Sequence, residues 1–286
     1  MIYLLICILS NAGILVVFKI AGIKKLDTFR IIVINYFTAA ILGYIIGGLP
    51  EKSDLNAGWM PMAILIGILF IVVFFIIALS TQRAGIAVTS VASKMSVVIP
   101  ISFSFLYFNE SVSALKITGL LLAIASVFMT TYNRDKAREK GILVVLLPIV
   151  IFFCAGIIDS LIKYTQEVHL SDQSTIIFST LLFSISALAG VIFSLFRKGI
   201  LRTEKLLQII IAGTILGIVN FFSLYGIIMA LESGIFDSSI VFGINNMGIV
   251  VLSVIIALIF FGEKLSGLNK AGIVLSVITI VLLSYL

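Results

Sequence analysis

The sequence contains little charge and few of the residues that usually carry catalysis. Only 11% of its 286 residues are charged and 61% are hydrophobic, whereas soluble domains are about one quarter charged. This balance excludes a soluble globular domain. The chain has a single His, two Cys and no HExxH, GxSxG or P-loop motif, which argues against a metalloprotease, a serine hydrolase or an ATP-driven machine. We therefore expect no enzyme activity, no cofactor and no metal site.

Long apolar runs take up most of the chain instead. A membrane-spanning helix needs about 20 mostly apolar residues. Stretches that meet this requirement occur at 2–20, 29–48, 60–81, 85–108, 111–132, 142–164, 172–196, 206–230, 235–261 and 264–286. The pattern predicts an all-α integral membrane protein with ten transmembrane helices and no soluble domain. The net charge of +6 reflects Lys and Arg at the helix ends, so we expect the lipid bilayer as a partner and no nucleic acid.

One stretch of the sequence occurs twice. Residues 78–129, shifted by 153 positions, fall on the C-terminal stretch, so that Glu110 meets Glu263 and Gly119 meets Gly272. The sequence therefore predicts two five-helix repeats, residues 1–132 and 142–286, joined by a basic connecting loop at 133–141. Because each repeat has an odd number of helices, the two repeats must be inverted, and the two copies of this hairpin should face each other.

Polar residues inside the apolar runs are the candidate site. Lys94 and Pro100 lie in the span 85–108, and Lys94 is about 14 Å from its start, too deep for easy snorkelling. A charge in lipid is costly and marks a functional candidate. Asn246 occupies the position of Ser93 in the second repeat, with Asn245 before it. We predict that Lys94 lines a central cavity with these asparagines and contacts the negative end of a substrate.

Other spans carry further polar side chains with two interpretations each. The additional predicted substrate-binding residues are Asn11, Tyr36, Asn220 and Tyr225, although an intramembrane asparagine can serve only to join helices. Asp159 is either a proton- or cation-coupling carboxylate that faces the cavity or a local salt-bridge partner of Lys163, four residues later. Lys19 closes the first span. It either only snorkels to the interface or belongs to a polar pattern of that helix.

The whole chain resembles the drug/metabolite transporter superfamily, EamA type, with two EamA units. The resemblance rests on the ALSTQRAGIAVTS turn, Pro100, the turn at Glu110 with Gly119, and their return at Glu263 and Gly272. Asn11 to Lys19 and the segment ending at Lys163 are similar to the family's first-helix pattern. Related sugar-phosphate and nucleotide-sugar transporters carry basic residues in helices 4 and 9, and Lys94 resembles the first of these. Asn245 and Asn246 occupy the positions in helix 9 where a basic pair would be, which argues against a phosphate substrate.

The resemblance implies a secondary transporter or exporter of a small polar metabolite, amino-acid-like or an organic anion. It would work by alternating access in the plasma (inner) membrane, with a site between the two repeats. The alternatives are a multidrug or sugar-phosphate-type transporter, a channel, or a membrane-embedded enzyme. Proton coupling is a possible addition. The sequence does not specify the substrate, the coupling ion or the direction, and it leaves monomer and dimer both open.

The distribution of basic residues predicts the orientation. Of the 19 Lys and Arg, three lie on one side and 15 on the other, namely Lys19, Lys24, Lys25, Arg30, Arg83, Arg134, Lys136, Arg138, Lys140, Arg197, Lys198, Arg202, Lys205, Lys264 and Lys270. Because basic loops stay in the cytoplasm, this count favours both termini outside. The family resemblance implies the reverse.

Overall fold

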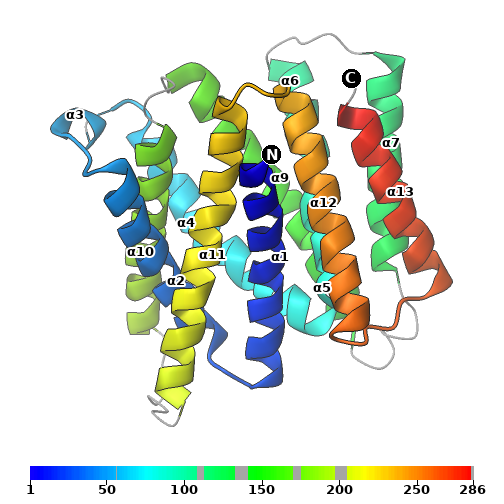
Figure 1. Cartoon of the computed structure of the whole chain (residues 1–286), viewed down its shortest axis with the longest axis horizontal. Helices are drawn as coiled ribbons and strands as arrows, with labels where there is room; N and C mark the ends of the chain where they lie inside the picture. Colours follow the sequence, from blue (N-terminus) through cyan, green and yellow to red (C-terminus); the bar gives the residue numbers. More distant parts are fainter. Residues whose placement is uncertain (56, 108–112, 133–140, 170–174, 197–204, 285–286) are drawn as a thin grey trace.

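The computed structural model describes residues 1–55, 57–107, 113–132, 141–169, 175–196 and 205–284. Within these ranges it contains helices and no strands, and ten segments are long and apolar enough to cross a membrane. Their outer surfaces carry exposed apolar side chains such as Ile45, Leu207 and Phe260, as contact with lipid requires. The chain is therefore an all-α, multi-pass integral membrane protein, as the sequence predicts (Figure 1).

The helices occupy the predicted ranges, with shifts at their ends and one break. They are α1 (Ile2–Ile23), α2 (Thr28–Gly47), α3 (Lys52–Leu55), α4 (Met60–Arg83), α5 (Ile86–Met95), α6 (Val98–Tyr107), α7 (Ala114–Thr131), α9 (Leu143–His169), α10 (Thr175–Phe196), α11 (Leu206–Glu232), α12 (Ser238–Ile259) and α13 (Gly267–Ser284).

The predicted span 85–108 forms two helices, α5 and α6, instead of one. Pro100 has no backbone N–H, so it leaves the carbonyl of Ser96 without its usual helical partner. The N–H of Ile99 donates to that carbonyl at 2.9 Å, in a tighter turn. The helix therefore breaks between Met95 and Val98, and its first half ends one residue after Lys94.

Helix α5 lies inside the molecule and contacts both predicted repeats. It packs against α1, α4 and α7 and against α9, α12 and α13. Helix α2 packs against α10 and α11, while α7 pairs with α13 at one edge (Figure 1). The two halves of the chain thus interleave, and the two copies of the predicted hairpin contact each other as expected. Both termini lie on the same side of the molecule.

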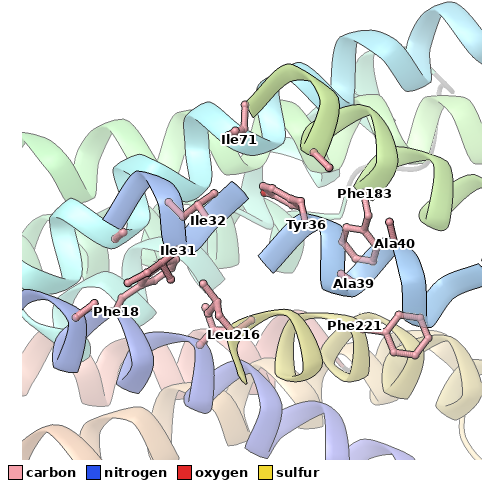
Figure 2. Packing of buried hydrophobic residues seen from close by; sticks show 14 of the residues in the cluster. Phe18, Ile31, Ile32, Tyr36, Ala39, Ala40, Ile71, Phe183, Leu216 and Phe221 are labelled. Atoms are coloured by element: carbon pink, nitrogen blue, oxygen red, sulfur yellow. The ribbon is translucent and has the colours of Figure 1, made fainter. Parts of the chain in front are cut away.

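The largest apolar core joins α1, α2, α4, α10 and α11. Figure 2 shows Tyr36, Phe183 and Leu216 within it, with Phe18 and Phe221 at its edges. Small residues allow α2 and α11 to approach closely, because a Cβ on Gly217 would lie 2.6 Å from the backbone oxygen of Asn35. This contact matches the small-residue packing expected in membrane helix pairs.

Some predicted features lie outside the described residues. These are the turn that contains Phe108 and Glu110, and most of the connecting loop at 133–141. The repeat boundaries and the inverted relation of the repeats therefore stay predictions.

Candidate functional site

Lys94 lies in the last turn of α5, where the helix break leaves carbonyl groups without helical partners. Its Nζ donates a hydrogen bond to Asn11 Oδ1 at 3.3 Å. Among the described residues it forms no ion pair. The C-terminal end of a helix carries partial negative charge and favours a nearby cation. The broken helix and one amide oxygen thus compensate the half-buried ammonium only in part.

A small cavity of about 60 Å³ lies beside Lys94. It has room for a few water molecules or one small polar group. Four helices form its wall, with Asn11, Ile14, Leu15, Phe74, Ile77, Ser90, Ser93, Lys94 and Ile249. The Ser90 hydroxyl is buried here and has no hydrogen-bond partner within the described structure. Lys94 and Ser90 therefore offer donors to a group that enters this space.

A series of hydrogen bonds fixes the orientation of Asn11. Its Nδ2 donates to the backbone oxygen of Cys7 at 3.0 Å, which leaves Oδ1 directed at Lys94. The Cys7 thiol donates in turn to the backbone oxygen of Ser223 on α11, at 2.9 Å. Sequence reasoning missed this role of Cys7, since nothing in the sequence alone places a thiol beside a carbonyl from α11.

Asp159 on α9 is the acidic residue that acts on Lys94. The two side chains are near enough for their charges to interact, yet they form no ion pair within 4.0 Å. The Asp159 side chain is exposed, although it lies one turn after Gly156 and two turns after Phe152, both buried. Asp159 therefore lies on the side of α9 that carries buried residues, although its own side chain is exposed.

The alternative pair of Asp159 with Lys163 is not formed. Lys163 Nζ donates to Ser104 Oγ on α6, at 2.6 Å. Asp159 therefore faces the interior charge of Lys94 and not its neighbour on α9.

The structure places the other predicted site residues at different distances from this cavity. Asn245 is buried near the Cys7 thiol, one turn before the cavity residue Ile249, and its Oδ1 has no partner in the described structure. Asn246, the next residue of α12, is half-buried. Their direct contact with a substrate stays a prediction.

Two tyrosines and Asn220 lie further from Lys94. Tyr36 packs in the core against Phe74, a cavity residue, with ring centroids 5.6 Å apart. Tyr225 stacks on Phe221 of the same helix, at 5.7 Å. Asn220 is buried on α11, and its backbone oxygen accepts from Ser223. Within the described part of the chain, no hydrogen bond or ion pair joins these three residues to Lys94, so their role in binding also stays a prediction.

Comparison with known proteins gives the family. The EamA-like transporter family matches residues 1–132. A protein of Haemophilus influenzae (strain ATCC 51907 / DSM 11121 / KW20 / Rd), described as an uncharacterized protein, is 32% identical over 294 residues and aligns with 99% of this chain and 97% of its own length. The chain belongs to the EamA-like transporter family.

The similarity of fold extends over the whole EamA-like chain. A crystal structure of another protein superposes on it with a TM-score of 0.62 at 15% identity, covering 100% of this chain and 98% of the other. At 15% sequence identity, this similarity shows a shared fold alone. Both halves of the chain therefore take part in one known fold.

Proposed function

We propose that this EamA-like protein is a secondary transporter of a small polar metabolite with a negatively charged group, working by alternating access in the cell membrane. The observation that carries the proposal is Lys94, a half-buried cation inside a membrane span, with one hydrogen-bond partner and no ion pair among the described residues. An uncompensated ammonium in a membrane interior costs several kcal/mol. A substrate anion that enters the adjacent cavity would supply the missing partner.

The surrounding charges favour a substrate with one negative charge. Lys94 is the single basic side chain that lines the cavity, and Asp159 acts on it from α9. A doubly charged phosphate would meet one cation and be repelled by one carboxylate, whereas a carboxylate group would be balanced by Lys94 alone. A charged wall also argues against an apolar drug as the main substrate.

Broken helices at mid-membrane are typical of carriers. In transporters built from repeats, discontinuous helices present their free ends to the substrate. The break between α5 and α6 places such an end beside Lys94. A channel would need a continuous open path, whereas α5 is buried from Ala84 to Ala92.

Counterflow in proteoliposomes tests the proposal. Purified protein is screened against small metabolites by thermal shift, because a ligand that binds only the folded state raises its stability. A stabilising metabolite is then loaded inside the vesicles, and uptake of the labelled compound is measured. We expect substrate inside to accelerate uptake, as only a carrier allows. A channel would show no acceleration.

Lys94→Met removes the charge and keeps the length of the side chain. We expect binding to weaken by about 2 kcal/mol or more, roughly 30-fold, with the fold intact. The matched control is Lys264→Met, which removes an exposed lysine outside the cavity. Undiminished counterflow in Lys94→Met, or an equal loss in Lys264→Met, would contradict the assignment of Lys94 as the substrate's partner.

A further inference from the structure

A second polar cluster lies at the end of α5 opposite Lys94. The Glu263 carboxylate, from the segment between α12 and α13, accepts from Lys19 Nζ of α1 at 2.7 Å. It also accepts from the backbone N–H of Ile86 at 2.9 Å and of Ala87 at 3.4 Å. One side chain from the C-terminal half thus caps the first turn of α5 and pairs with a cation of the N-terminal half.

The turn before α5 is shaped to admit this carboxylate. Gly85 has φ +111°, a conformation that L side chains rarely adopt, and a Cβ there would lie 2.5 Å from Glu263 Oε2. The side chains of Lys19 and Glu263 are 18% and 6% exposed, so the ion pair is largely removed from solvent. Lys19 therefore does not snorkel to the interface, which was one of the two interpretations from its sequence position.

The molecule is closed at this end. Every residue from Ala84 to Ala92 is buried. The stretch that matches the start of α5 in the second half, at the 153-residue shift, is the start of α12 at the other end of the molecule (Figure 1). There Asp237 and Ser238, which match the buried Ala84 and Gly85, are exposed, and Asp237 forms no side-chain cap. Two segments that match in sequence thus differ in burial.

Inward-facing side chains are exposed toward the other end. Phe242 lies one turn before Asn245 and two turns before Ile249, both buried, yet it is 45% exposed. Asp159 on α9 is likewise exposed, although it lies one turn after Gly156 and two turns after Phe152, both buried. Side chains near the two ends of the molecule therefore differ in burial: those around Glu263 are buried, whereas Phe242 and Asp159 are exposed.

We propose that Lys19, Glu263 and the first turn of α5 form a latch, a closed contact that must open before substrate can pass on the side of the basic loops. The proposal rests on the proposed transport function. Glu263 holds the short helix that carries Lys94, so it is a positioning residue for the substrate site as well as a seal. Opening brings both charged groups into water, which replaces the hydrogen bonds that are lost, so the contact can form and break in each cycle.

The test measures access to α5 without any substrate. Val88, buried in the first turn of α5 against Ala84 and Val144, is replaced by Val88→Cys in a background with Cys7→Ser and Cys154→Ala. Alkylation by a small thiol reagent is followed in proteoliposomes. We expect Glu263→Gln and Lys19→Met each to raise the alkylation rate about tenfold, because either change removes the ion pair that holds the closed state.

Asp27→Asn is the matched control, because Asp27 also caps a helix and pairs with a basic residue, Arg30 of α2. Its cap and its ion pair both belong to α2, so its variant should leave alkylation of position 88 unchanged. Size-exclusion profiles show which variants are folded. Unchanged alkylation in the folded latch variants, an equal rise in Asp27→Asn, or failure of both latch variants to fold would each overturn the latch.

Counterflow in the same vesicles separates the two proposals. Absence of counterflow in the unaltered protein refutes the transport function, whatever the alkylation shows. If counterflow is present and alkylation of position 88 does not respond to Glu263→Gln or Lys19→Met, only the latch is wrong.

Discussion

The charge on Lys94 is balanced by several weak contributions and no strong one. Asn11 Oδ1 accepts a hydrogen bond from one of its three N–H groups, the C-terminal turn of α5 adds partial negative charge, and the Asp159 carboxylate acts from α9. Each is smaller than a direct ion pair, and a substrate anion would exceed them all. A site of this kind can bind its ligand and release it again, because neither state is strongly favoured.

Asp159→Asn tests whether this carboxylate couples protons to transport. Asp159 of α9 carries the acidic group that acts on Lys94 of α5. A proton bound by Asp159 would remove the negative charge, change the field at Lys94 and so change the affinity for an anion. We expect counterflow to vary with pH in the unaltered protein and to become independent of pH in Asp159→Asn.

Glu232→Gln serves as the control, since Glu232 is exposed at the end of α11. It should keep both the rate and the pH profile. A pH profile that survives Asp159→Asn unchanged would assign the dependence to another group.

Sequence reasoning found the candidate residues but could not choose between their interpretations. Lys94 was identifiable because a lysine deep in an apolar run is rare and costly. The partners of Asp159 and Lys19 were not, because several helices could supply them. Glu263 was visible as a repeated turn glutamate, yet its contact with the backbone of α5 depends on how the two halves pack.

Among the elements, the division of one predicted span into α5 and α6 has the largest consequence. Hydropathy predicts the length of a span but not its continuity. Pro148 also lies inside a helix, and α9 continues without a break from Leu143 to His169. A proline near the start of a helix removes a hydrogen bond of the first turns, whereas Pro100 lies in the middle of a span and must redirect the carbonyl of Ser96. Sequence alone does not distinguish these outcomes reliably.

Pro100→Ala should restore a continuous helix through the break. The substituted alanine would supply the N–H that the Ser96 carbonyl lacks, so we expect about 1 kcal/mol of added stability. We also expect slower counterflow, because the end of α5 beside Lys94 would lose its free carbonyl groups and its independence from α6. Thermal unfolding and transport rate measured on the same preparation check both effects.

Pro148→Ala is the matched control for this change. It should also stabilise the protein slightly, while counterflow stays at the unaltered rate. Counterflow of Pro100→Ala at the unaltered rate would show that the break between α5 and α6 does not contribute to transport.

At the scale of the whole molecule, matching segments of the two halves differ in burial although they resemble each other in sequence. Helix α5 begins in a buried turn held by Glu263, whereas α12 begins among exposed residues. A duplicated sequence predicts two similar halves and gives no reason for either one to be closed. The difference follows from packing, because the Glu263 carboxylate accepts from the first backbone N–H groups of α5, whereas Asp237 forms no side-chain cap on α12.

The last prediction concerns which side of the membrane is closed. Lys205 Nζ donates to the backbone oxygen of Lys24, and Lys19 pairs with Glu263, so these basic segments gather at the end of the molecule opposite the termini (Figure 1). By the positive-inside rule this end is cytoplasmic, with both termini outside. The latch would then close the cytoplasmic side, and the cavity would open outward.

Cysteines introduced at exposed positions on each side test the orientation in the background without native cysteines. Glu232 ends α11 on the side of the termini, and Lys270 lies in the first turn of α13 on the basic side. We expect an impermeant maleimide to label Glu232→Cys in intact cells and to label Lys270→Cys only after the cells are permeabilised. Labelling of Lys270→Cys in intact cells would place both termini inside, as the family resemblance implies. The side closed by Lys19 and Glu263 would then face outward, so the same experiment also fixes the direction from which substrate reaches Lys94.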